Sequence, residues 1–307
     1  MRVRVLGAAA GGGFPQWNAD SEACRRARRG DPGALPATQA SIAISVDGRR
    51  WTLVNAAPDL RQQIEANPCL HPQGGERSSP IAAVVLTNAD VDAVAGLLHL
   101  REGTPFTIYA HARVLDVLER NPIFEVVNRD LVPRRRLIEE VETLLADAVG
   151  TALGPVVRPF LAPGKLPLYL EREVAAVDTE AMAGDTLGLE VTAGGRRMVY
   201  LANCARITEP LRRRIDGADL LFMDGTLWRD DEMIVQGIGA KTGRRMGHIS
   251  MSGPDGPIAR LRDLRIGQRV FIHINNTNPA LLADSPERTE LEWAGWKVAQ
   301  DGMELRL

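Results

Sequence analysis

The strongest constraint on the fold is a series of short apolar segments, each of which ends in a turn-forming or polar residue. Apolar segments of this length, bounded by Gly, Pro, Asn and Asp, are typical of β-strands. We predict strands at residues 3–7, 41–46, 51–55, 81–87, 106–110, 167–170, 187–193, 198–203, 219–224 and 269–274. Helical periodicity indicates helices at residues 93–102, 111–121 and 135–146, and near residues 208–215, 256–263 and 285–294.

These segments form two β-rich halves, and each half closes with helices. A chain of this kind buries its apolar strands by packing two sheets face to face, and helices then cover the outer faces. The 307 residues contain no evident internal repeat and no low-complexity linker. The sequence therefore predicts a single α/β domain over residues 1–307, built as a four-layer αββα sandwich.

Composition excludes several classes of protein. The 37 basic and 39 acidic side chains give a net charge of −2, whereas a nucleic-acid-binding protein needs an excess of Lys and Arg. No apolar run is long enough for a membrane-spanning helix, and residues 1–7 read directly as a strand, so we expect a cytoplasmic location. The three cysteines, Cys24, Cys69 and Cys204, are too few and too scattered for a disulfide scaffold.

Two acidic segments are candidates for chemistry at strand ends. Asn88, Asp90 and Asp92 follow the predicted strand at 81–87 with a spacing of two residues, which places them on one side of an extended chain. Asp224 ends another apolar strand and is followed by Gly225. Carboxylates at such positions suit divalent metals. The alternative is structural: Asp and Asn also favour turns and helix N-caps.

Two histidines occupy comparable positions. His248 lies in the predicted loop over residues 244–253, and His273 lies at the end of the apolar strand over residues 269–274. A single histidine is more often structural than functional, but two histidines and two aspartates near strand ends favour a metal site. The polar residues after His273, which include Asn275, Asn276 and Asn278, are predicted to form a wall of the substrate pocket.

Two further regions are candidates for contacts with a ligand. The glycine-rich segment over residues 7–18 lacks the spacing of a phosphate-binding loop, so we predict a loop that folds over the site, with Phe14 and Trp17 against the substrate. Arg206, Arg244 and Arg245 suit a ligand with several carboxylates.

Seven segments of the chain closely resemble the pyrroloquinoline quinone (PQQ) biosynthesis protein B family of the metallo-β-lactamase superfamily. They cover residues 7–18, 55–64, 87–103, 223–233, 241–253, 273–281 and 294–305. The resemblance covers essentially the full length. It implies the αββα fold and an iron-dependent hydroxylase that acts on the tyrosine ring of a cross-linked Glu–Tyr intermediate. The expected cofactor is Fe(II), and the expected partner is this dipeptide-like PQQ precursor.

An older view of the family implies the alternative of a non-catalytic carrier or transport role, in which PQQ itself is the ligand. The sequence is also compatible with a homodimer.

The resemblance also assigns the ligand positions. Hydrolytic members of the superfamily carry the motif His-x-His-x-Asp-His, and the corresponding residues here are Asn88, Asp90, Asp92 and Ala93. The matching iron triad is Asp92, residue 93 and His273, but Ala93 offers no donor. His248, Asp224 or a water molecule is then expected to complete the metal site. Because three histidines of the motif are missing, metal-dependent hydrolysis is a weaker alternative.

The chain also differs from the usual pattern of the family near the N-terminus. Members of the family usually carry three closely spaced cysteines in a structural zinc site, whereas this chain has only Cys24 in that segment. One thiolate cannot hold a tetrahedral zinc ion, so we expect no structural zinc. Two explanations account for the missing histidine at position 93 and the missing cysteines: natural divergence of the chain, or deliberate substitution at ligand positions.

Overall fold

The computed structural model describes residues 1–164 and 184–307. In these residues the strands form two seven-stranded sheets. The first sheet has the order β14 (Glu304–Arg306), β1 (Arg2–Gly7), β2 (Ser41–Ser45), β3 (Trp51–Val54), β4 (Ile81–Leu86), β5 (Thr107–His111) and β6 (Arg134–Leu137). The second has the order β13 (Trp296–Val298), β12 (Gln268–Ile272), β11 (Leu220–Asp224), β10 (Arg196–Leu201), β9 (Leu187–Ala193), β8 (Ala152–Leu161) and β7 (Thr143–Ala146).

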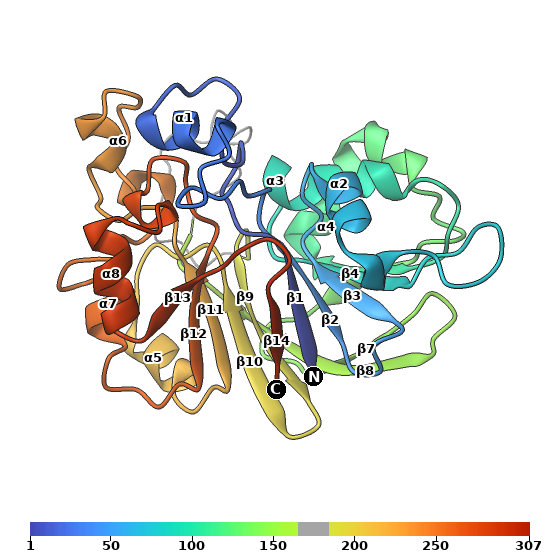
Figure 1. The fold of residues 1–307 in the computed structure, drawn as a ribbon. Helices are drawn as coiled ribbons and strands as arrows, with labels where there is room; N and C mark the ends of the chain where they lie inside the picture. The colour runs from blue at the N-terminus through green and yellow to red at the C-terminus, as the bar shows by residue number, and fades with distance from the viewer. Residues whose placement is uncertain (165–183) are drawn as a thin grey trace.

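Short helices connect these strands. The α-helices are α1 (Glu22–Arg28), α2 (Leu60–Ala66), α3 (Val91–Val94), α4 (Ala112–Arg120), α5 (Glu209–Ile215), α6 (Glu232–Val235), α7 (Pro257–Arg260) and α8 (Pro286–Trp293). The 3₁₀ helices are η1 (Pro68–Leu70), η2 (Ala95–Leu100), η3 (Pro122–Val126), η5 (Arg244–Met246) and η6 (Pro279–Leu281). In Figure 1 helices α2, α3 and α4 lie outside the first sheet, and α5, α7 and α8 lie outside the second.

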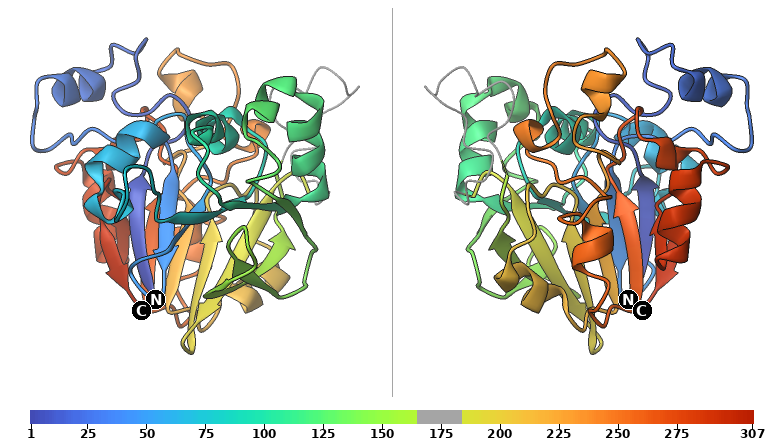
Figure 2. Two further views of the ribbon diagram at one scale, coloured as in Figure 1. Left: turned by 90° about the vertical axis from the view of Figure 1, so that its right-hand side faces the viewer. Right: turned by 90° about the vertical axis from the view of Figure 1, so that its left-hand side faces the viewer.

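The apolar residues separate into three layers. The layer between the sheets includes Val5 of β1, Tyr200 of β10 and Phe222 of β11. The alternate residues of the same strands face outward: Val199 and its neighbours pack under the helices of the second sheet, and a third cluster lies under α2 and α4. This alternation explains why most strands read as continuous apolar runs, since both of their faces are buried. The predicted αββα architecture is confirmed (Figure 2).

Parallel pairing places the functional segments at one rim. Strands β3 to β6 pair in parallel in the first sheet, and β10 to β13 do so in the second. The carboxyl ends of parallel strands meet at the same edge of a sheet, which is where ligands bind in open α/β folds. The loops after β4, β10, β11 and β12 therefore start from this edge.

One predicted helix is wrong. Residues 135–146 form the end of β6 and all of β7, which lie at the outer edges of different sheets. The spacing of apolar residues resembled a helix, but Ile138, Val141 and Leu144 are about half exposed, whereas one face of a packed helix would bury them. The helix predicted at 93–102 is a short α-helix that continues as 3₁₀ helix η2. The strand predicted at 167–170 lies outside the described residues.

Among the described residues, no helix is both long enough and apolar enough to cross a bilayer.

Candidate metal centre

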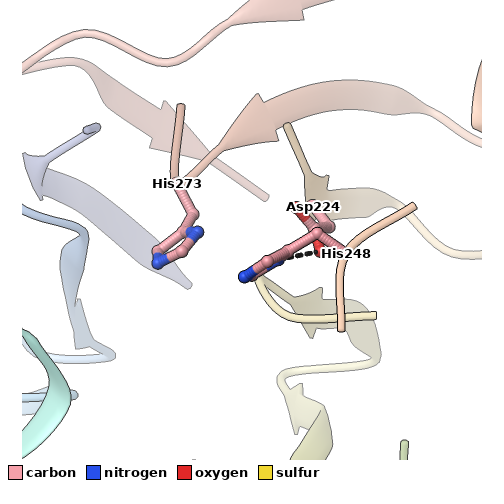
Figure 3. Close-up of side chains that lie close together, drawn as sticks. All are labelled: Asp224, His248 and His273. Atoms are coloured by element: carbon pink, nitrogen blue, oxygen red, sulfur yellow. Dashed lines mark hydrogen bonds and ion pairs between the residues drawn. The ribbon is translucent and has the colours of Figure 1, made fainter. Parts of the chain in front are cut away.

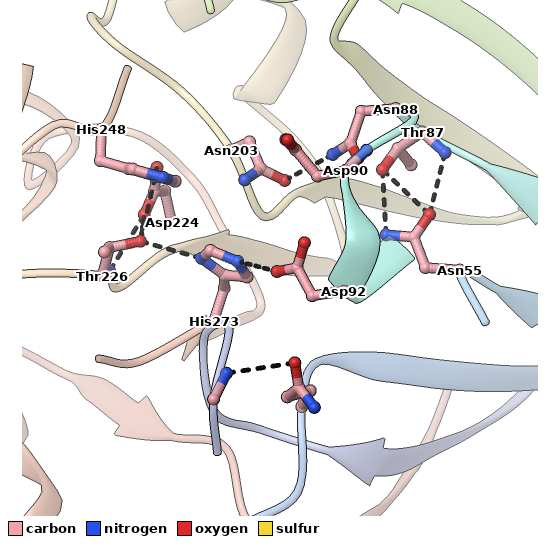
Figure 4. A network of polar contacts seen from close by, with 12 residues as sticks. Asn55, Thr87, Asn88, Asp90, Asp92, Asn203, Asp224, Thr226, His248 and His273 are labelled. Carbon is pink, nitrogen blue, oxygen red and sulfur yellow. Dashed lines mark hydrogen bonds and ion pairs between the residues drawn. The ribbon is translucent and has the colours of Figure 1, made fainter. Parts of the chain in front are cut away.

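Four predicted site residues converge at the rim of the sandwich (Figure 4). Asp224 is the last residue of β11, and His273 directly follows β12. Asp92 lies in α3, a few residues after the end of β4, and His248 lies just beyond η5. Asp92 and His273 meet in space although 181 positions separate them in the chain.

Asp92 and His273 form a partly buried ion pair. The Nε2 atom of His273 lies 2.9 Å from Oδ2 of Asp92, and the two side chains are 8% and 19% exposed respectively. Burial opposes the charge on Asp92, but the hydrogen bond and positive charge of His273 outweigh it, so the pKa of Asp92 is lowered. Burial also opposes protonation of His273, yet the hydrogen bond and charge of Asp92 raise its pKa. Each partner thus stabilises the charged form of the other.

Asp224 is a fully buried carboxylate with every contact satisfied. Its Oδ1 accepts hydrogen bonds from the backbone N–H of Thr226 at 3.0 Å and from the Thr226 hydroxyl at 2.7 Å. Its Oδ2 accepts from the backbone N–H of Cys204 and from Nδ1 of His248, both at 2.8 Å. A carboxylate engaged in this way orients a histidine and sets its tautomer, as carboxylates commonly do behind metal ligands.

Thr226 connects the two imidazoles. Its Oγ1 lies 3.0 Å from Nδ1 of His248 and 2.9 Å from Nδ1 of His273. Because the hydroxyl donates its proton to Asp224, we assign both Nδ1 atoms as donors. A metal at this site would therefore bind the Nε2 atoms, and at His273 it would take the place of the proton shared with Asp92. The two rings stack with centroids 5.2 Å apart and an interplanar angle of 23°.

These donors fit a divalent transition metal. One donor atom each from Asp224, His248 and His273 lie within 4.8 Å of one another (Figure 3). The 2.9 Å between Nε2 of His273 and Oδ2 of Asp92 also matches two ligands at right angles on one cation, which stand about 3.0 Å apart for bonds of about 2.1 Å. Imidazole and carboxylate donors together suit zinc and iron. The structure thus brings Asp224, His248 and His273 together, and Asp92 reaches the same cluster through His273.

Backbone strain occurs at two points of the network. His273 and Asn55 have φ values of 62° and 63°, a region that residues other than glycine rarely adopt. Each such residue costs on the order of 1–3 kcal/mol and persists where the surrounding structure holds it. Asn55 is held by Thr87, whose backbone N–H donates to Asn55 Oδ1 at 2.9 Å and whose Oγ1 accepts from Asn55 Nδ2 at 3.0 Å. This pair ties the ends of β3 and β4 together below the Asp92 loop.

The other positions of the first motif have structural contacts. Oδ1 of Asn88 accepts from the backbone N–H of Asp90 at 2.9 Å, which is the turn expected under the structural alternative. Nδ2 of Asn88 donates to Oδ1 of Asn203 at 3.1 Å. Ala93 is 2% exposed and packs in the apolar cluster under α2 and α4. Of these motif residues, Asp92 hydrogen-bonds to His273, and the negative charge of Asp90 also helps to raise the pKa of that imidazole.

The predicted polar wall after His273 divides into two parts. Asn275 is partly exposed and donates to Thr277, and Asn276 donates to Oε1 of Gln16 in the N-terminal loop. Asn278 is fully buried: its Nδ2 donates to the carbonyl of Gly225, and its Oδ1 accepts from the backbone N–H of Ala280. The side chain of Asn278 is therefore committed to the loop itself and not to a ligand.

The N-terminal loop reaches the site without a covering aromatic ring. A Cβ atom on Gly11 would lie 3.8 Å from Oδ2 of Asp92, so the backbone passes beside the ion pair. Phe14 is 2% exposed and packs in the apolar cluster of the second sheet with Cys24, so the expectation that it covers a substrate is wrong. Trp17 is 85% exposed, and its ring covers neither the site nor the core in this structure. Arg245 is exposed on η5.

Sequence inspection missed three contributors to the site. Thr226 and Asn203 each follow a strand end by two residues, a position that could have identified them. Gly11 has no side chain, so the backbone can pass beside Asp92, and no sequence motif indicates this contact. Cys204, a weaker candidate, is a buried thiol whose pKa is raised by burial, and its backbone N–H is the group that contacts Asp224.

Comparisons with known proteins identify the family of the chain. Residues 50–274 match the family model described as a β-lactamase superfamily domain. Coenzyme PQQ synthesis protein B from Gluconacetobacter diazotrophicus is 55% identical over 98% of each chain. The crystal structure described as Zn(2+)-bound PqqB from Methylobacterium extorquens superposes with a TM-score of 0.95 at 51% identity and full coverage of both chains. A diphosphatase of the PhnP family, 20% identical with a TM-score of 0.69 and coverage of 100% and 97%, shares the fold. The chain belongs to the coenzyme PQQ synthesis protein B family of the β-lactamase superfamily.

Proposed function

We propose that this chain acts in PQQ biosynthesis as a non-haem iron hydroxylase of the tyrosine ring in a cross-linked Glu–Tyr intermediate. The names of its relatives support the pathway. The observation that carries the proposal is the close pair of Asp92 and His273, with His248 on the other side of the His273 ring. Two imidazoles and one carboxylate form the donor set typical of Fe(II) oxygenases.

The residues of the chain have separate roles in this proposal. Asp92, His273 and His248 hold the metal, and Fe(II) bound there supplies the electron transfer to dioxygen that hydroxylation requires. Asp224 and Thr226 keep the two imidazoles in one orientation and one tautomer. The hydrogen bond from His273 falls on Oδ2 of Asp92, so in this proposal Oδ1 accepts the hydroxyl proton of a phenolic substrate.

Oxygen consumption tests the proposal. The purified chain is supplied with Fe(II), a reductant and the cross-linked Glu–Tyr dipeptide, and dioxygen uptake is followed together with the mass of the product. We expect uptake that needs all three components and a product heavier by one oxygen atom. Asp92→Asn should lower the rate about 100-fold or more. The matched control is Asp116→Asn, since Asp116 is an exposed aspartate on α4. Uptake that is independent of iron, or unchanged in Asp92→Asn, contradicts the proposal.

A carrier role is the second candidate, and the alanine at position 93 favours it because one expected ligand is missing. A carrier binds PQQ or its precursor without consuming oxygen. The same experiment therefore separates the two functions: tight binding of PQQ with no iron-dependent uptake supports the carrier.

A further inference from the structure

A large cavity opens beside His248. Its volume is about 670 Å³, which lies in the range of small-molecule binding sites. The loops after β10 and β11, the segment around η5 and the end of α7 form its walls. His248 lines the cavity and also belongs to the candidate metal centre. A ligand in the cavity therefore reaches the metal centre through this imidazole.

The lining is cationic. It contains four arginines from four different segments of chain: Arg206, Arg229, Arg244 and Arg260. Two carboxylates, Asp230 and Asp255, also line it. Oδ1 of Asp230 already accepts a hydrogen bond from the backbone N–H of Arg244 at 2.7 Å, and this bond holds the Arg244 segment in place. The arginines outnumber the acidic groups, so the wall favours anions.

Two of these guanidinium groups are available to a ligand. Arg260 has an ion pair with Glu209 at 2.8 Å. Arg229 and Arg244, by contrast, have no carboxylate oxygen within 4.0 Å in the part of the chain that the structure describes, and their side chains donate no hydrogen bond there. Guanidinium groups bind carboxylate and phosphate oxygens through paired, charge-assisted hydrogen bonds.

The lining between the arginines is mixed. Ala205, Ile207 and Ile249 are buried apolar residues, and each contributes to the cavity. Ser250 adds a hydroxyl group. Apolar lining next to fixed cations favours a ligand with an apolar body and anionic substituents over a small, fully hydrated ion.

We propose that this cavity is an anion-recognition subsite, in which Arg229 and Arg244 bind two oxyanion groups of one ligand and direct its body toward His248. The chemistry is that of a ligand with at least two carboxylate or phosphate groups on an apolar scaffold. The inference rests on the proposed function, because it places the substrate of the metal centre in this cavity.

Calorimetric titration tests the subsite on the full chain, once after treatment with a chelator and once with Zn(II) restored. The probes are benzene-1,3,5-tricarboxylate, benzoate and inorganic pyrophosphate. We expect the tricarboxylate to bind more tightly than benzoate, with an affinity that falls as salt rises. The double variant Arg229→Gln/Arg244→Gln should weaken binding by roughly tenfold to a hundredfold. The control Arg262→Gln removes the same charge from an exposed position outside the cavity and should leave binding unchanged.

The outcomes are distinct. Stronger binding of the tricarboxylate than of pyrophosphate assigns the subsite to carboxylates, and the reverse order assigns it to phosphates. Equal binding by the native chain and the double variant, or an equal loss in Arg262→Gln, overturns the proposal. The two proposals can fail separately, because ligand binding is also measured on the chelated protein. Absence of ligand binding would contradict the subsite but not the metal centre. Absence of iron-dependent oxygen uptake would contradict the proposed hydroxylase but not the subsite.

Discussion

The two sheets contribute unequally to the rim. The loops of the second sheet supply Asp224, His248 and His273, joined through the hydroxyl of Thr226. The first sheet supplies Asp92, and the motif positions around it carry three residues with no imidazole: Asn88, Asp90 and Ala93. One side is therefore rich in metal donors, while the other is held by amide hydrogen bonds.

This difference shows how one fold can support different chemistry. The amide contacts of Asn88 and Asn55 keep the loop of the first sheet in shape, so Asp92 still reaches His273. We propose that a metal binds at the boundary between the two sheets, where Asp92 meets His273. The histidines of the first motif, which hold the metal that activates water for hydrolysis, are missing.

The largest effect on metal affinity is expected for His273→Ala, because His273 contacts site residues from both sheets. Its loss deletes one metal donor and leaves Asp92 without its charged partner. We expect the affinity for Fe(II) to fall by about 100-fold or more, measured by anaerobic titration. His99→Ala is the control, because His99 is exposed and its ring forms a hydrogen bond with the carbonyl of Pro58, away from the metal centre. An equal loss in both variants contradicts the assignment.

Asp224→Asn tests the donor-rich half alone. The amide keeps the shape of the side chain but places an N–H₂ group where one of the two acceptor oxygens stands. Loss of a carboxylate behind a metal-binding histidine lowers metal affinity by roughly 10-fold to 100-fold. Anaerobic Fe(II) titration measures this loss, and urea unfolding measures the cost in stability. A variant that keeps native affinity would show that His248 is not a ligand.

Ala93→His tests the donor-poor half. The added imidazole supplies the ligand that the family resemblance expects next to Asp92, and Fe(II) affinity should rise by about tenfold. Position 93 is buried among apolar side chains, so the unfolding free energy must be measured alongside. A stable variant that gains no affinity places the third ligand elsewhere, and His248 is then the remaining imidazole.

The smallest expected effect is on the pH dependence of stability after chelation. The raised pKa of His273 stabilises the fold below its ordinary value of 6.5, and this contribution is lost as the pH rises through the raised pKa. The lowered pKa of Asp92 contributes above its ordinary value of 3.8 and is lost as the pH falls through the lowered pKa. The pair therefore contributes fully between these two ordinary values. Urea unfolding of the native chain and of His273→Gln should differ most in that window, and a constant difference at every pH contradicts the ion pair.

The sequence predicted the sandwich and the four rim residues because both follow from local patterns. Buried strands are runs of apolar residues, and a polar residue at the end of such a run can be recognised in the sequence alone. Periodicity predicts one helix where the structure has β6 and β7, because the pairing of these strands with β5 and β8 is a long-range contact that local spacing does not reflect. Of the three arginines predicted to contact a ligand, Arg206 and Arg244 line the cavity, whereas Arg245 is exposed on η5 and does not line it. The direction of a side chain on a short 3₁₀ turn depends on the tertiary fold.

The most direct test of the central claim is a crystal soaked with Fe(II) without oxygen and measured at the iron absorption edge. The account predicts one anomalous peak within bonding distance of both Nε2 of His273 and a carboxylate oxygen of Asp92, with His248 as the nearest further imidazole. A peak bound only by residues of the second sheet, or a rim with no peak at saturating iron, would contradict a shared metal site between the two sheets.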